Sequence, residues 1–194
     1  ELFTNSDEIE MIIYSYSNEL DNTQRINMNK EGEGWIGKYS SSDTSRGFII
    51  KFVSDNSMDD NDQLGFIIKM HNNGDEVVGA NAGLASVYTR YGGTLNLIAG
   101  RDSASKYFDI EFQKNPELKR DYLNQYFNSF PRKKRIKIAE AELFNLENED
   151  NLTKNDYETL TNGFRTNKDF VKAEKYYELL QKEYPDSRLV ASRF

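Results

Sequence analysis

Short segments rich in branched and aromatic residues run from about Ile9 to Phe112, and clusters of Gly, Asn, Asp and Ser separate them. The segments read EMIIYSYS, QRINMN, WIGKY, GFIIKFVS, LGFIIKMH, TLNLIAG and KYFDIEF. Such residues favour strands, and strands at roughly 10-residue spacing are typical of antiparallel sandwiches or barrels. We therefore predict an antiparallel, β-sandwich-like domain over residues 1–114.

The first of these segments is open to a second interpretation. A helical period also fits its apolar residues Ile9, Ile12, Ile13, Tyr16 and Leu20. The alternation of Ile12, Tyr14 and Tyr16 with serines favours a strand instead. Further along, HNNGDE (His71 to Glu76) predicts a hairpin, because an Asn-Gly pair tolerates positive φ.

After Phe112 the spacing of apolar residues becomes helical and stays so to the end of the sequence. Asn115 and Pro116 have the order of a capping residue followed by a first-turn proline. We predict a second domain over residues 115–194, with helices near 116–129, 132–147, 154–166 and 169–184 and a short fifth helix at the terminus. The expected fold class is therefore multidomain, β followed by α.

The helical region repeats with a period of 34 residues, since Arg120 to Thr153 aligns with Lys154 to Ser187. The matched pairs are Leu123 with Tyr157, Tyr126 with Leu160, Phe130 with Phe164, Ala139 with Ala173, Leu143 with Tyr177 and Leu146 with Leu180. A 34-residue period of large apolar residues on one helix, a small residue on the next and a final proline resembles the tetratricopeptide repeat. The second copy carries the family's signature spacing in Tyr157, Leu160, Phe164, Ala173, Tyr177 and Pro185.

This resemblance implies α-hairpin repeats at 120–153 and 154–187, and the start of a third repeat at 188–194. We expect the natural protein to continue beyond Phe194, because stacked repeats bury a continuous core only when several are present. We also expect Ala173 to lie where helix 169–184 crosses helix 154–166, since a close crossing needs a small side chain.

In the tetratricopeptide family, the face formed by the first helix of each repeat usually receives a protein partner. Carried over to this sequence, the partner-binding positions are Asp121, Asn124, Asn128, Asn155, Glu158, Asn162 and Arg165. Most of these are amides, and the Lys and Arg cluster that clamps acidic C-terminal peptides is missing. The resemblance therefore predicts a non-enzymatic scaffold or adaptor that binds another protein through its helical repeats.

The segment KYYELLQKEYPDS is similar to repeats of bacterial envelope proteins, such as outer-membrane assembly lipoproteins and periplasmic flagellar-motor scaffolds. The chain has no cysteine and opens at Glu1 rather than Met, which are both compatible with export. We therefore predict a periplasmic or otherwise extracytoplasmic protein.

Composition narrows the classes of partner. The 194 residues carry a net charge of −7, which argues against nucleic acid as a partner. No run approaches the roughly 18 apolar residues of a membrane span, so we expect no direct insertion into a membrane. Absent cysteine excludes disulfides, thiolate nucleophiles and cysteine zinc sites, and His71 is the one source of imidazole.

The candidate chemical motifs are weak. GEGWIG (Gly32 to Gly37) has the G-x-G-x-x-G spacing, and GFIIK, which ends at Lys51, resembles the strand that carries a kinase's ATP lysine. No helix pattern or kinase motif follows, so we interpret these glycines as a hairpin turn that leaves Trp35 on a strand. PRKKR (Pro131 to Arg135) is interpreted as the exposed start of a helix.

We accordingly expect no catalytic residue, no cofactor and no resident metal. The four carboxylates of DNSMDDND (Asp55 to Asp62) leave calcium binding there open. The segment lacks the spacing and the closing Glu of an EF-hand loop, so we interpret it as a solvated loop. Paired carboxylates also stay open, since 32 acidic residues permit many pairs.

A second class of function rests on the aromatic residues of the β-rich domain. Aromatic residues make up 13% of the chain, and exposed rings near turns can stack on sugars or hold a peptide. The candidate ligand-binding rings are Trp35, Tyr39, Tyr88 and Tyr91. Core packing is the competing interpretation for aromatic residues on strands.

Overall fold

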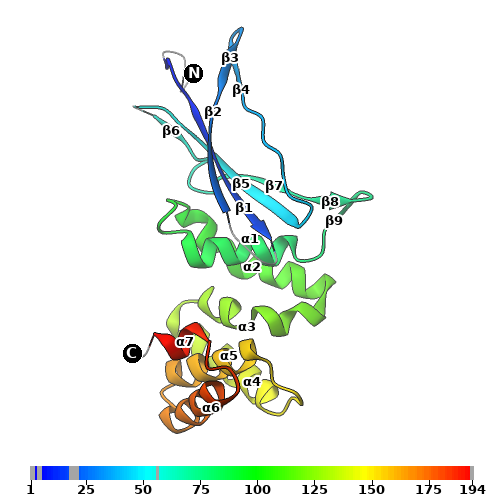
Figure 1. Cartoon of the computed structure of the whole chain (residues 1–194), viewed down its shortest axis with the longest axis vertical. Helices are drawn as coiled ribbons and strands as arrows, with labels where there is room; N and C mark the ends of the chain where they lie inside the picture. Colours follow the sequence, from blue (N-terminus) through cyan, green and yellow to red (C-terminus); the bar gives the residue numbers. More distant parts are fainter. Residues whose placement is uncertain (1–2, 4–5, 18–21, 56, 193–194) are drawn as a thin grey trace. The chain divides into compact units, whose positions relative to one another are not determined.

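The computed structural model describes residues 3, 6–17, 22–55 and 57–192. The chain divides into two compact units, Glu1–Asn115 and Pro116–Phe194. Strands occur in the first unit, and helices predominate toward the C-terminus, as the change from blue to red in Figure 1 shows. The predicted order, antiparallel strands followed by helices, is confirmed.

The first unit is built on an antiparallel sheet with strand order β2-β1-β5-β6, in which β7 also pairs with β5. The strands are β1 (Glu10–Ser17), β2 (Asn22–Asn27), β5 (Ser45–Val53), β6 (Met58–Asp59) and β7 (Phe66–Lys69). β1 is central, and its Tyr14 lies opposite Thr23 of β2 and Ile49 of β5. The strand interpretation of EMIIYSYS is therefore confirmed.

Two helices form the layer on one face of this sheet (Figure 1). α1 (Ala80–Tyr91) packs on β1 and β5, and α2 (Ile98–Lys114) packs on α1. Gly83 of α1 allows the close approach, because a Cβ there would lie 2.6 Å from the ring of the fully buried Tyr16.

The prediction of a sandwich-like domain is wrong for this unit, because helices and not a second sheet cover the strands. TLNLIAG lies in a turn and the first residues of α2, and KYFDIEF lies within α2. The aromatic and branched residues of α2 are helical because Ala104, Phe108 and Glu111, spaced by about one turn, are all buried.

Glu111 of α2 caps the start of α1 across the hairpin. Its two carboxylate oxygens accept hydrogen bonds from the backbone N–H groups of Gly79 (2.8 Å), Asn81 (2.9 Å) and Ala82 (3.3 Å). The first turn of α1 has no acidic residue and no side-chain cap of its own. Glu111, which is 1% exposed, supplies the acceptors that a local capping residue normally provides.

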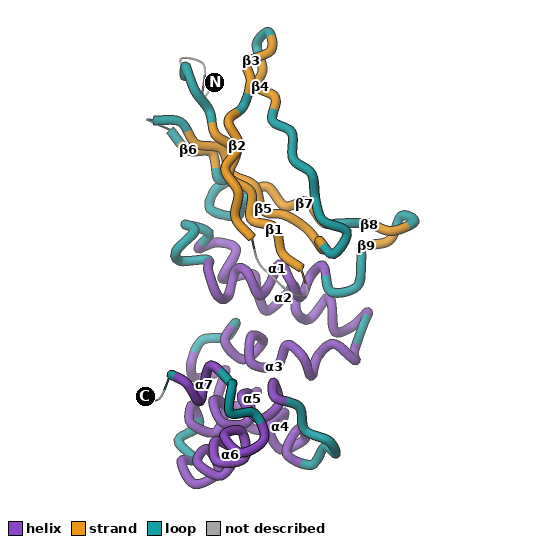
Figure 2. Tube along the Cα trace, in the orientation of Figure 1, coloured by secondary structure: helices purple, strands orange, loops and turns teal. Residues whose placement is uncertain are grey.

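The other face of the sheet holds a second apolar cluster, centred on Met11, Ile13 and Phe48. The loop between β4 (Gly34–Ile36) and β5 covers part of it and is the long connection drawn in teal in Figure 2. Tyr39 of that loop contacts Phe48 edge to face, with ring centroids 5.3 Å apart.

Two small hairpins complete the first unit. β3 (Asn29–Glu31) and β4 turn at Gly32, whose φ is +61°, so the GEGWIG glycines form a hairpin turn as predicted. β8 (His71–Asn72) and β9 (Asp75–Glu76) form the hairpin expected at HNNGDE. Asn73 and Gly74 both have positive φ, which that turn requires.

The second unit consists of helices joined by short connections. They are a 3₁₀ turn η1 (Pro116–Leu118), α3 (Lys119–Asn128), α4 (Arg132–Glu147), α5 (Lys154–Thr166), α6 (Phe170–Glu183) and α7 (Arg188–Ala191). The helices predicted from the apolar spacing correspond to these elements, with ends that differ by no more than a few residues. Thr153 and Asp156 form a capping box at the start of α5.

One core runs through α3, α4, α5 and α6. Leu123, Leu143 and Leu160 are among its buried members. Ala173 of α6 is 5% exposed and belongs to the same cluster as Leu160 and Phe164 of α5, as the close-crossing argument requires. A second cluster of Tyr177, Leu180 and Val190 attaches α7 to α6.

Candidate functional site

The first helices of the two hairpins, α3 and α5, lie side by side. Together they form the face that the sequence analysis predicted to bind a protein partner. The side-chain amide of Asn155 on α5 donates a 3.1 Å hydrogen bond to the backbone oxygen of Asp121 on α3. Asp121 and Asn155 are corresponding members of the predicted set, 34 residues apart in the sequence. The fold therefore brings the α3 half and the α5 half of that set together.

A buried ion pair fixes the same two helices at their N-terminal ends. Arg120 of α3 donates to both carboxylate oxygens of Asp156 on α5, with a shortest distance of 2.8 Å from Nη2 to Oδ2. The Asp156 side chain is 1% exposed. Burial by itself would raise the pKa of Asp156, but hydrogen bonds from Arg120 and Thr153 outweigh burial and hold the pKa below its usual value.

The α3–α5 face is polar and carries little net charge. Its exposed members are Asp121, Asn128 and Arg165, and its half-buried members are Asn124, Asn155, Glu158 and Asn162. Asn128 Nδ2 lies 3.5 Å from Asn124 Oδ1, within hydrogen-bond range but at its limit. Among the described residues, the side chains of Asn162 and Arg165 make no hydrogen bond or ion pair.

Glu158 has a structural role in addition to its place on this face. Its Oε1 accepts a 2.6 Å hydrogen bond from the hydroxyl of Ser187, the residue that caps α7. A substitution at Glu158 would therefore disturb the attachment of α7 as well as the face, which makes Glu158 a poor probe of partner binding.

The second helices of the hairpins, α4 and α6, are joined by a polar cluster around Glu147. Glu147 accepts hydrogen bonds from Lys172 (2.6 Å) and from the Tyr176 hydroxyl (2.8 Å). Burial, and then the bond to Glu147, raise the pKa of Tyr176 well above its usual value, which keeps its hydroxyl a donor. This cluster holds α4 and α6 in place behind the α3–α5 face.

Sequence reasoning missed three exposed apolar side chains on these second helices. Phe144 is 66% exposed, Phe170 65% and Val171 83%. The signal for them is that each lies outside the apolar stripe that builds the core. Sequence reasoning also missed a cavity of about 190 Å³ between α3 and α4, whose lining includes Lys119, Arg120 and Glu149.

The four aromatic residues proposed to bind a ligand do not form an exposed row. Tyr88 is fully buried, and its hydroxyl donates a 2.6 Å hydrogen bond to the backbone oxygen of Leu64, so its proposed stacking role is corrected to a core role. Tyr39 is packed on Phe48. Trp35 is half-buried on the β3–β4 hairpin beside Lys30, and Tyr91 is 40% exposed at the end of α1.

The acidic segment from Asp55 to Asp62 spans β6 and two turns, and Asn56 within it lies outside the described residues. Asp60 accepts hydrogen bonds from the backbone of Gln63 and from the Asn96 amide, so it organises the chain around it. Within the described part of the chain, no three acidic or histidine side chains gather as a metal site would require.

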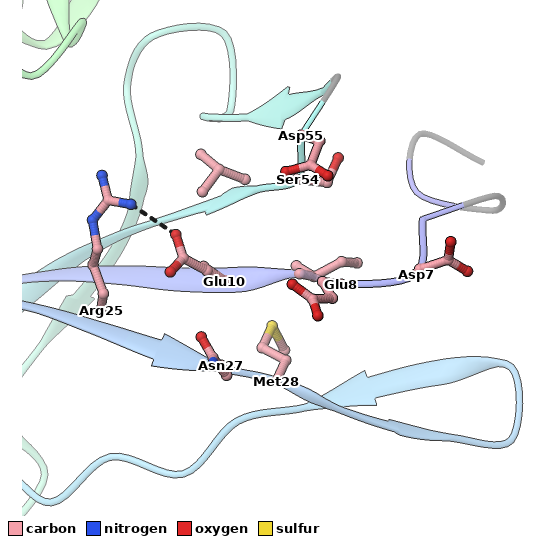
Figure 3. Close-up of a pocket in the computed structure, with 10 residues that line it drawn as sticks. Asp7, Glu8, Glu10, Arg25, Asn27, Met28, Ser54 and Asp55 are labelled. Atoms are coloured by element: carbon pink, nitrogen blue, oxygen red, sulfur yellow. Dashed lines mark hydrogen bonds and ion pairs between the residues drawn. The ribbon is translucent and has the colours of Figure 1, made fainter.

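A polar cleft of about 540 Å³ lies at one end of the sheet and is drawn in Figure 3. Asp7, Glu8, Glu10 and Asp55 contribute carboxylates to its lining. Glu10 is paired with Arg25 at 2.8 Å. In Figure 3, Asp7, Glu8 and Glu10 follow one another along one segment, and Asp55 comes from another.

The remaining motifs have ordinary surroundings. PRKKR begins α4, and Arg132, Lys133 and Lys134 are exposed there as predicted. His71 is exposed beside the β8–β9 turn, where its Nδ1 lies 3.0 Å from the backbone oxygen of Lys69. Lys51 donates a hydrogen bond to the backbone oxygen of Leu95.

Comparison with protein-family models, with curated proteins and with solved structures found no match to this chain.

Within the described ranges, no helix is both long enough and apolar enough to cross a membrane.

Proposed function

We propose that this chain is a non-enzymatic scaffold for protein–protein interaction, and that its helical unit binds a protein partner as tetratricopeptide repeats do. The observation that carries the proposal is the hydrogen bond from Asn155 to Asp121, which joins residues 34 positions apart on the first helices of successive hairpins. Equivalent helices of stacked repeats lie side by side and form one continuous binding face.

Unused polar groups on the α3–α5 face support a binding role. The side chains of Asn162 and Arg165 have no hydrogen-bond partner among the described residues, although each can form several bonds. An Asn amide donates and accepts at once, so a row of amides suits the backbone of an extended partner segment. A basic cluster is missing from this face, so we do not expect it to select acidic C-terminal peptides.

The proposed setting is a bacterial envelope assembly, such as outer-membrane assembly or the flagellar motor. Its support is the similarity of α6 and the turn after it, KYYELLQKEYPDS, to repeats of such proteins. We accordingly propose a periplasmic or otherwise extracytoplasmic location. Cell fractionation tests this: recovery of the parent protein only in the cytosolic fraction, with no signal sequence in its gene, would contradict it.

Carbohydrate binding through the first unit, the alternative function, has weaker support. Tyr88 is buried and therefore unavailable for stacking, and Tyr39 is half-buried with its ring packed on Phe48. Tyr91, another of the four rings, is 40% exposed and remains available for peptide binding by the same unit.

Affinity capture with charge-reversed variants tests the scaffold proposal. Asp121→Lys combined with Arg165→Glu changes two exposed residues of the face without removing a described side-chain bond. The matched control is Glu140→Lys combined with Lys137→Glu, which makes the same exchange of charge on the exposed side of α4. We expect the face variant to lose partners that the wild type and the control retain. An identical set of partners for all three proteins would overturn the assignment of the face.

A further inference from the structure

β2 is an edge strand whose outer side is unpaired in the described part of the chain. The backbone N–H of Met28 donates to the backbone oxygen of Ile9, so these two residues form a hydrogen-bonded pair. In an antiparallel ladder, hydrogen-bonded pairs alternate with pairs that are not hydrogen-bonded. By this alternation, Ile26, Gln24 and Asn22 bond to β1. The N–H and C=O groups of Thr23, Arg25 and Asn27 therefore point outward.

This edge lacks the features with which proteins usually block strand pairing. Its sequence, NTQRIN, contains no proline and no lysine, and the β1–β2 register runs without a bulge. The one charged residue, Arg25, is engaged by Glu10 at 2.8 Å. An exposed, unblocked edge is a template onto which an additional strand can add.

An apolar pocket of about 210 Å³ lies beside this edge on the side of the sheet that α1 covers. Its lining is Tyr14, Ser15, Asn22, Thr23, Val87, Tyr91 and Leu95. Sites for drug-sized ligands are commonly about 300–1,000 Å³, so this pocket fits one large side chain better than a whole small molecule.

The edge and the pocket are in register with each other. Thr23 belongs to both, because its backbone groups point outward and its side chain faces α1 together with Tyr14, its partner in the ladder. In a strand added beside β2, the side chain next to Thr23 on that face would enter the pocket, since alternate side chains of a strand share one face.

We propose that β2 and α1 form a peptide-binding groove, which takes an extended segment of another protein as an added strand and holds one aliphatic or aromatic side chain in this pocket. A second copy of the chain is a poorer occupant. The side chains that β2 itself directs toward the helices include Thr23 and Arg25, which are polar and would not fill an apolar pocket.

The test uses the full chain and a library of labelled seven-residue peptides in which threonine alternates with leucine, isoleucine, valine, phenylalanine or tyrosine. Binding is measured by fluorescence anisotropy. We expect at least one peptide to bind with a Kd below about 1 mM, and its analogue with N-methylated amides to fail, because N-methylation removes the backbone donors. If no peptide binds, the proposal is wrong.

Two variants test the groove. Thr23→Pro removes an outward N–H, since Thr23 does not donate to β1. The control is Gln24→Ala, because the exposed Gln24 side chain lies on the other face of the sheet from the pocket. Tyr91→Ala removes one wall of the pocket at a partly exposed position. We expect Thr23→Pro and Tyr91→Ala each to weaken binding about tenfold or more, while Gln24→Ala binds like the wild type.

Two outcomes would overturn the proposal in these experiments. One is unchanged affinity in both variants, with the fold verified by circular dichroism. The other is concentration-dependent dimerisation that the peptides compete with, which would make the edge a contact between copies of this chain. The Arg165→Glu variant lies in the helical unit and should leave peptide binding unchanged, which separates this proposal from the scaffold proposal.

Discussion

The side-chain amide of Asn155 donates a hydrogen bond to the backbone oxygen of Asp121, 34 residues earlier in the chain. This single bond relates the sequence period to the three-dimensional arrangement, because it joins corresponding parts of α3 and α5. The predictions that follow ask whether the two hairpins are coupled, whether they cross as the period requires, and how the first unit is held together.

Removing the guanidinium that neutralises Asp156 should destabilise the helical unit. Arg120→Ala leaves a carboxylate that is 1% exposed with only its bonds to Thr153, and an under-satisfied buried group costs about 1–3 kcal/mol. Urea unfolding followed by circular dichroism measures the loss. In the double variant with Asp156→Asn, the loss should be smaller than the sum of the two single losses, because the residues interact directly. Additive losses would show that the pair does not couple α3 to α5.

A larger side chain at Ala173 should overpack the crossing of α5 and α6. Ala173→Leu is expected to lower the free energy of unfolding by about 1–3 kcal/mol, because the core around Leu160 and Phe164 has no room for it. Ala141→Leu on the exposed side of α4 is the control and should change stability by about 0.5 kcal/mol or less. Equal effects of the two substitutions would contradict the close crossing.

Glu111→Gln should destabilise the first unit by about 1–3 kcal/mol, because one acceptor oxygen is replaced by a donor that faces backbone N–H groups. Asp102→Asn, at an exposed position of α2, makes the same change of charge as a control. Trp35 is the single tryptophan and belongs to the first unit, so its fluorescence during urea unfolding reports on that unit. A shift in the control equal to that in Glu111→Gln would argue against the capping role.

Acid should weaken the first unit through Glu76. Hydrogen bonds, first from Lys69 and then from Asn81 and Lys114, lower the pKa of Glu76 from 4.5 to about 2 although burial opposes them. A carboxyl whose pKa is lower in the folded state adds stability above pH 4.5 and loses it as the pH falls toward 2. We expect the Trp35 unfolding midpoint to fall across this window, and to fall less in Glu76→Gln. Parallel pH profiles for the two proteins would exclude this contribution.

The sequence was sufficient where local pattern decides the structure. Examples are the alternation in β1, the positive-φ pair Asn73 and Gly74, and the apolar period of α4 to α6. Each of these patterns depends on residues only a few positions apart in the sequence. Those elements were therefore predictable without knowledge of the tertiary contacts.

The two helices of the first unit were not predictable in this way. α1 is rich in small residues, of which Gly83 lies close to Tyr16. α2 contains Tyr107, Phe108 and Phe112, which by themselves favour strands. The cap that Glu111 provides lies about 30 residues from the helix start it stabilises, as the bond to Asn81 shows. Such long-range satisfaction of polar groups leaves no signal in the local pattern.

The candidate sites also differ in whether the local sequence pattern predicts their residues. Residues of the α3–α5 face follow from a repeat period and could be named in advance, whereas the pocket beside β2 needs Val87 and Tyr91, which come from a helix the pattern did not predict. Tyr88 was misassigned for the same reason, because its burial depends on α1 packing against the sheet.

The central claim is that a protein partner contacts the α3–α5 face, and site-specific photo-crosslinking tests it most directly. A photoreactive residue is placed at Asn162, on the face, or as a control at exposed Glu178 on α6, each in the full chain expressed in its native cell. The account predicts a crosslinked partner from position 162 and none from position 178. A crosslink from position 178 alone, or none from position 162 while the partner is still captured, would contradict it.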